Sequence, residues 1–280
     1  MIDVGGRRIH ALAAGRSGEG PLVVLEAGAF GFSADWAMVQ EGLAARDIRS
    51  LAYDRAGLGF SDAGPRPRDS AAIVADLESL LAGSGETGPF VLCGHSMAGL
   101  SLRLFCSRNR DRVAGVVLVD ATTPEAMDSR LLSGLVGQFG AFARMAAWAA
   151  GAGLFRHFAH TSWGDRIGLE GAAATEKRWA FASAGHNHWA AEEVAHWRTS
   201  ADQAREAGPF DFDLPISVVL AEETHGRSAL RRLQIAPALA SRSGSVTEAT
   251  GASHATILSE PYAATIVTEI ERVRAAAAAC

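Results

Sequence analysis

The sequence predicts an α/β protein built on a mostly parallel, doubly wound sheet. Short apolar runs recur along the chain, and the stretches between them carry apolar residues at helical spacing. The runs are continuous rather than alternating, which is typical of strands buried on both faces of a parallel sheet. Strands that alternate with helices in this way place helices on both faces of the sheet.

The elements follow in chain order. Ile2 to Val4 and Arg8 to Ala14 flank the turn residues Gly5-Gly6 and predict a hairpin. Five further apolar runs predict sheet strands: Pro21–Glu26, Ile48–Tyr53, Phe90–Cys93, Val113–Val119 and Ile216–Leu220. Four stretches with helical periodicity are expected between or after them: Asp35–Ala45, Ser70–Leu81, Ser96–Asn109 and a last one from about Pro261 to the alanine-rich end.

One long stretch breaks the alternation. Thr122 to about Phe212 reads mostly helical and contains every tryptophan except Trp36. An insertion between sheet strands must lie outside the sheet, and open α/β sheets bind ligands at the carboxyl ends of their strands. We therefore expect a core of residues 1–121 and 213–280, with a helical cap of residues 122–212 inserted after the sixth strand.

Composition excludes several classes of function. The 280 residues are 48% hydrophobic and carry a net charge of −5, with no basic stripe, so a nucleic-acid partner is not expected. No apolar run approaches the ~20 residues that cross a bilayer, and the N-terminus lacks the apolar stretch of a secretory signal. Cys93, Cys106 and Cys280 fit no metal-ligand spacing and are expected to be reduced thiols of a cytoplasmic protein. The oligomeric state is left open.

The strongest chemical signal is Gly94-His95-Ser96-Met97-Ala98-Gly99, which lies between a predicted strand and a predicted helix. A serine at such a sharp turn is exposed above the sheet and can act as a nucleophile, whereas the alternative is an ordinary serine that caps a helix. Because Met97 begins the helix, its backbone N–H is the natural first donor to an oxyanion.

Three more segments complete a resemblance to the α/β-hydrolase superfamily, in particular its serine esterase and proline-iminopeptidase-like branch. They are Leu25–Gly31, Tyr53–Asp62 and Ser253-His254-Ala255 with Glu260-Pro261. The resemblance implies the α/β-hydrolase fold over essentially the whole chain, Ser96 as nucleophile and His254 as general base. It implies the backbone N–H of Gly28, or of Ala29 if the alignment shifts, as second oxyanion donor. Glu26 is expected to pair with an arginine.

The acid of the implied triad has more than one candidate. Relatives usually place an aspartate in the loop after the strand that is Ile216–Leu220 here, but this loop offers only Glu222 and Glu223. The superfamily's other position is the end of the preceding strand, where Asp120 lies. We predict Asp120, with Glu223 or Glu222 as the alternative.

The expected function is hydrolysis of small to medium, largely apolar carboxylic esters, without a metal or organic cofactor. His186 and His188 lack a partner at metal-ligand spacing. The candidates for the substrate pocket are Phe30, His95, Trp148, Trp163 and Trp189.

Alternatives stay open. An aminopeptidase or amidase would need an acidic anchor for an amine, with four candidates in the insertion: Glu170, Glu176, Glu192 and Glu193. A lactonase, lyase or acyltransferase could use the same triad, and a receptor could keep the fold without turnover. A serine at position 96 disfavours the dehalogenase and epoxide-hydrolase branches, whose nucleophile at this turn is an aspartate.

Overall fold

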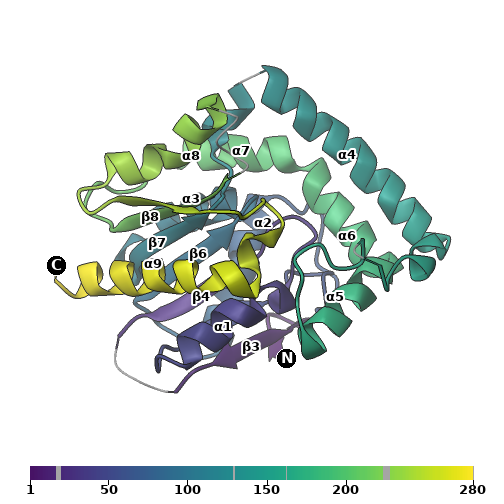
Figure 1. The fold of residues 1–280 in the computed structure, drawn as a ribbon, viewed down its shortest axis with the longest axis horizontal. Helices are drawn as coiled ribbons and strands as arrows, with labels where there is room; N and C mark the ends of the chain where they lie inside the picture. The colour runs from purple at the N-terminus through teal and green to yellow at the C-terminus, as the bar shows by residue number, and fades with distance from the viewer. Residues whose placement is uncertain (17–19, 129, 162, 223–227, 280) are drawn as a thin grey trace.

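A computed structural model describes residues 1–16, 20–128, 130–161, 163–222 and 228–279. Its main sheet has seven strands in the order β3-β5-β4-β6-β7-β8-β9 (Figure 1). β3 runs antiparallel to β5, and every other neighbouring pair is parallel. The predicted α/β architecture is therefore confirmed. The strands are β3 (Ala11–Ala14), β4 (Leu22–Glu26), β5 (Ser50–Tyr53), β6 (Phe90–His95), β7 (Val113–Val119), β8 (Ile216–Ala221) and β9 (Ser245–Ala249).

Successive residues of the central strands feed two separate cores, as the period of a strand requires. Val23 and Leu25 of β4 pack with α1 (Ala37–Ala44) and α9 (Glu260–Ala278) on one face. Leu22 and Val24 pack with α2 (Ser70–Gly83) and α3 (Ala98–Arg108) on the other, where α8 (Ser228–Ala240) also lies. The continuous apolar runs of the sequence thus reflect burial on both faces.

The predicted hairpin differs in its second strand. β1 (Ile2–Asp3) pairs with β2 (Arg8–Ile9) in a small sheet of its own, and β3 joins the edge of the main sheet. The break falls at His10, whose backbone N–H donates to Ser61 Oγ at 2.9 Å and whose carbonyl accepts from the Asp54 N–H. Competing bonds to the 54–62 turn divide the predicted strand in two.

The insertion lies between β7 and β8. Its described residues include the α-helices α4 (Arg130–Gly151), α5 (Gly171–Ala182), α6 (Ala184–Ala195) and α7 (Trp197–Glu206). Because the predicted second strand is divided, the insertion follows the seventh strand in chain order rather than the sixth. α7 packs on α2 and α3, and α4 packs on α6 (Figure 1).

Two of the three cysteines are described, and both Cys93 and Cys106 are free and buried. Cys280 lies outside the described residues. Within the described ranges, no helix combines the length and the hydropathy needed to span a membrane.

Candidate active site

Ser96 occupies the tight turn between β6 and α3 with a φ of 56°, a left-handed conformation that L-residues rarely adopt. Only small neighbours allow this turn. A Cβ atom on Gly94 would lie 2.5 Å from Leu102 Cδ1, and one on Gly99 would lie 2.4 Å from the carbonyl oxygen of Thr122. Backbone bonds fix the strained residue, because its N–H donates to the Val119 carbonyl and its own carbonyl accepts from Thr122.

Three side chains from three loops meet at this turn. His254 Nε2 lies 3.0 Å from Ser96 Oγ, and His254 Nδ1 lies 2.5 Å from Asp120 Oδ2. Gln234 Nε2 donates to the other oxygen of Asp120 at 3.1 Å and so holds the buried carboxylate in orientation. With Nδ1–H directed at the carboxylate, Nε2 is free to accept the serine proton, which is the arrangement that activates a serine for nucleophilic attack.

Glu222, one of the other acid candidates, does not join this group. Glu222 is exposed, and its carboxylate accepts the backbone N–H of Gly251. Glu223 lies outside the described residues. Asp120 is thus the carboxylate that the structure brings to His254.

The loop after β4 passes directly beside the serine. A Cβ atom on Gly28 would lie 2.9 Å from Ser96 Cβ and 3.1 Å from His95 Nδ1, so only glycine leaves room there. Met97 is buried at the start of α3, and Ala29 packs in the same apolar cluster. The backbone of Gly28 therefore lies beside Ser96, and Met97 follows Ser96 in the chain.

His95 lies beside His254, with their ring centroids 4.8 Å apart and His95 Nε2 placed 3.1 Å from the His254 carbonyl. Burial, reinforced by the neighbouring His254, lowers the pKa of His95 to about 3. His95 is therefore neutral near pH 7, and its Nε2–H donates to that carbonyl.

A buried ionic cluster lies beside the loop that follows β4, and the sequence predicted only part of it. Arg55 donates to Glu26 Oε1 at 2.9 Å and, through Nε and Nη2, to both oxygens of Glu193 on α6. It also donates to the carbonyls of Ala27 and Gly28. Burial raises the pKa of Glu26, which Arg55 partly offsets. Burial alone would lower the pKa of Arg55, but Glu193 and Glu26 raise it instead.

The expected pairing of Glu26 with an arginine is thus observed. Its second acidic partner, Glu193, is distant in the chain. No local pattern in the sequence could have identified it.

The aromatic candidates for the substrate pocket differ in how far they are packed against other residues. Phe30, with a φ of 59°, packs its ring against Phe139. Trp189 lies against Gly57. Trp148 is 71% exposed and Trp163 is 62% exposed, so neither is enclosed as a buried pocket wall would be.

The remaining histidine candidates have structural partners. His186 is buried, accepts the Gly59 N–H through Nδ1 and lies 3.2 Å from the Phe30 carbonyl through Nε2. His188 lies beside Arg66. Among the described residues, no group of three or more His, Cys, Asp or Glu could hold a metal ion.

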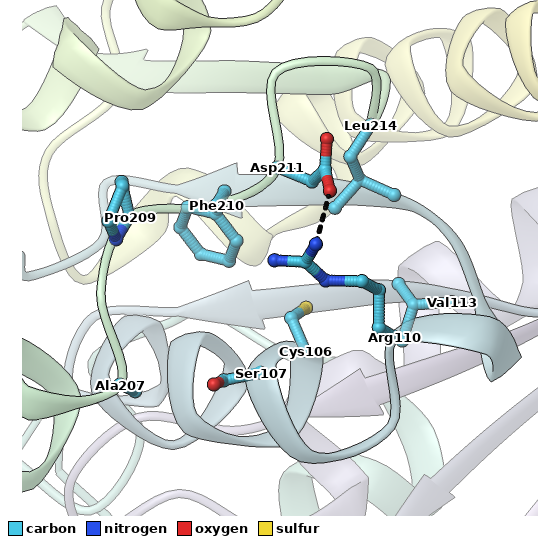
Figure 2. A pocket seen from close by; sticks show the side chains of 9 residues that line it. All are labelled: Cys106, Ser107, Arg110, Val113, Ala207, Pro209, Phe210, Asp211 and Leu214. Carbon is cyan, nitrogen blue, oxygen red and sulfur yellow. Dashed lines mark ion pairs between the residues drawn. The ribbon is translucent and has the colours of Figure 1, made fainter.

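The structure contains two hollows of interest, one near His254 and one far from Ser96. One, of about 470 Å³, is lined by residues 163 and 165–168 of the insertion and by Thr256, two residues after His254. The other, of about 30 Å³, lies at the start of β7, away from Ser96 at the carboxyl end of β6 (Figure 2). Arg110 and Asp211 form an ion pair of 3.0 Å there, and the space suits about one water molecule.

Comparison with known proteins gives a family match and partial relatives. The family model described as "Alpha/beta hydrolase family" matches residues 22–267. A protein of Hormonema carpetanum named "Probable transporter efuK" is 33% identical over 129 residues, which cover 44% of this chain and 18% of that protein. The chain spans less than half the length of each curated relative it matches.

Solved structures match over nearly the whole chain. Cfl2 from Burkholderia cenocepacia superposes with a TM-score of 0.73 at 21% identity, over 96% of this chain and 93% of that one. An enol-lactonase from Burkholderia xenovorans LB400 gives 0.66 at 22% identity, over 96% and 98%. Epoxide hydrolases and an esterase are also among the matches. At these identities the likeness establishes the fold.

Proposed function

The chain belongs to the alpha/beta hydrolase family, and we propose that it is a serine hydrolase that cleaves carboxylic esters through an acyl-enzyme on Ser96. The observation that carries the proposal is the chain of contacts from Asp120 through His254 to Ser96 Oγ, at 2.5 and 3.0 Å. Nucleophile, base and orienting carboxylate are each within hydrogen-bond reach of the next, as nucleophilic catalysis requires.

The proposed mechanism uses these groups in turn. His254 Nε2 takes the proton of Ser96 as Oγ attacks the ester carbonyl, and the backbone N–H groups of Met97 and Gly28 donate to the oxyanion. Asp120 holds the imidazole tautomer and stabilises the imidazolium. The imidazolium then protonates the leaving alcohol, and a water molecule activated by His254 hydrolyses the acyl-enzyme.

The contacts weigh against two other chemistries. Epoxide hydrolases among the fold neighbours would, by the resemblance, carry an aspartate where this chain carries Ser96. An aminopeptidase needs a free acidic anchor. Of the four candidates, Glu193 is committed to Arg55 and Glu192 lies 3.6 Å from Arg66, which leaves Glu170 and Glu176. A small or medium, largely apolar ester fits the proposal best, because the apolar cluster around Met97, next to Ser96, includes Phe30 and Phe139.

The test is steady-state hydrolysis of p-nitrophenyl esters from acetate to decanoate, with Ser96→Ala as the control variant. We expect multiple turnovers that disappear in Ser96→Ala, although that variant keeps its fold. Labelling of the wild type by a fluorophosphonate should also disappear in the variant.

Two results would overturn the proposal. One is ester turnover that survives in folded Ser96→Ala. The other is labelling of Ser96 without turnover of any ester, which would favour an amide, a lactone or a receptor function.

A further inference from the structure

α4 buries one face and carries large apolar side chains outside it. Ala143, Ala146 and Ala150 are buried, and α4 packs against α6. Phe142, 50% exposed, lies at the border of the buried face, where its ring stacks against Phe139, and Met145, 61% exposed, lies farther round the helix. A helix whose outer face is also apolar presents a surface that suits a partner rather than water.

The sequence after the helix adds further exposed apolar side chains. Trp148 extends the α4 stripe by a further three positions, and the chain after the helix adds Leu154, Phe158 and Trp163, each 47% to 62% exposed. Half of the large hydrophobic side chains that are exposed among the described residues thus fall between positions 142 and 163. α4 lies along the outer edge of the molecule (Figure 1), and the exposed side chains of Phe142, Met145 and Trp148 form its outer apolar surface.

The same segment has an unusual charge. From Arg130 to Gly164 the sequence contains arginines and no aspartate or glutamate, although the whole chain has a net charge of −5. Arg144, Arg156 and His157 are exposed within it. The outer apolar surface therefore lies in a segment with arginines and no acidic residue, in a protein whose net charge is −5.

We propose that this surface docks on an anionic lipid bilayer. Large aromatic side chains favour the headgroup region, and arginines beside them are attracted to anionic headgroups. A symmetric dimer through the same surface would gather the arginines of both copies at one interface without an acidic residue of the segment to pair with them, which disfavours a second copy as the occupant. The inference concerns binding alone and does not depend on the ester chemistry proposed above.

The test is co-sedimentation with vesicles of phosphatidylcholine, with and without about 30% phosphatidylglycerol. Every protein tested carries Ser96→Ala, so hydrolysis of the lipid cannot alter the measured binding. We expect binding to the anionic vesicles that weakens at high salt. Phe142→Ser/Met145→Ser/Trp148→Ser should reduce the partition coefficient at least about tenfold, because these side chains supply the apolar contact.

Matched controls separate this surface from exposure in general. Phe212→Ser/Leu239→Ser removes two other exposed apolar side chains, 61% and 72% exposed, and should leave binding unchanged. Arg144→Gln/Arg156→Gln should weaken binding to the anionic vesicles, whereas Arg16→Gln/Arg108→Gln should weaken it less. Thermal unfolding verifies that each variant is folded.

Three outcomes would overturn the proposal. One is protein that stays in the supernatant with the anionic vesicles, and another is a triple variant that binds them as tightly as its parent. The third is a dimer in sedimentation equilibrium that dissociates in the triple variant, which would assign the surface to a second copy.

Discussion

Arg55 Nη2 donates to the carbonyl oxygen of Gly28 at 2.8 Å, and so joins the turn after β5 to the loop that flanks Ser96. The same guanidinium binds Glu193 on α6 and Glu26 at the end of β4. A single buried side chain therefore connects the insertion to the proposed oxyanion loop. We infer that Arg55 is a positioning residue for the backbone of Ala27 and Gly28.

Arg55→Lys should lower kcat more than it changes KM. A lysine ammonium cannot reproduce the planar set of bonds to two carboxylates and two carbonyls, so the loop loses its support. We expect a fall in kcat of about 10- to 100-fold, less than the ~10²- to 10³-fold fall that follows complete loss of an oxyanion donor. Ester kinetics and the rate of fluorophosphonate labelling measure it.

The matched control is Arg46→Lys, whose arginine is 39% exposed and pairs with Glu271. It should leave kcat unchanged. A folded Arg55→Lys protein with normal kcat would show that the cluster only stabilises the fold.

Asp120→Asn should reduce kcat/KM by about 10³- to 10⁴-fold, because an amide no longer holds the Nδ1–H tautomer of His254 or stabilises its charged form. Glu222→Gln serves as the comparison, since Glu222 contacts the Gly251 N–H instead of His254. Ester kinetics on both variants decide between the two positions. The reverse order of losses would move the acid to the loop after β8.

The sequence predicted those parts of the site that local patterns encode. The turn around Ser96 needs small residues within a few positions, and such a constraint is visible in six consecutive letters. Asp120 could be proposed because strand ends of a parallel sheet meet at one edge, but a choice among three acids needed coordinates. The bond from Arg55 to Glu193 joins residues 138 positions apart, which no periodicity reveals.

Strand β9 and helix α8 were missed for a related reason. β9 lies at the sheet edge and is mostly half-buried, so its sequence Ser245–Ala249 is largely polar and lacks the apolar run used to find strands. α8 contains Pro237, which disrupts a helical pattern. Exposure of Trp148 and Trp163 depends on how the insertion packs, and tryptophan content alone cannot specify it.

Acid should destabilise the protein through His186. Burial lowers its pKa to about 3 in the fold, from 6.5 for an ordinary histidine. The unfolded chain therefore binds a proton between these values and the folded one does not, so stability is full above pH 6.5 and falls as the pH drops toward 3. One such histidine accounts for up to about 2 kcal/mol at about pH 5.

Urea unfolding at about pH 7.5 and about pH 5 tests this on two variants. His186→Gln removes the buried histidine, and His157→Gln, which removes an exposed one, is the control. The free energy of unfolding of His186→Gln should fall less between the two pH values than that of His157→Gln. Equal losses in both variants would exclude His186 as a source of the acid sensitivity.

The contact between Gly57 and Trp189 tests how firmly α6 is seated on the core. Gly57 has a φ of 85°, and a Cβ atom there would lie 2.2 Å from Trp189 Cγ. Gly57→Ala should therefore lower the free energy of unfolding through two effects, the strain of a positive φ and a clash with the indole. We expect a loss of about 2 kcal/mol or more.

Gly5→Ala separates the two effects, because Gly5 has a φ of 91° and a Cβ atom there would meet nothing within 4 Å. It should cost only the backbone strain, about 1 kcal/mol. In a Trp189→Ala background the clash is absent, so the cost of Gly57→Ala should fall toward that of Gly5→Ala. If the cost stays the same without the indole, α6 is not held against the 54–62 turn through this contact, and the bonds of Arg55 to Glu193 and of Gly59 to His186 hold it there instead.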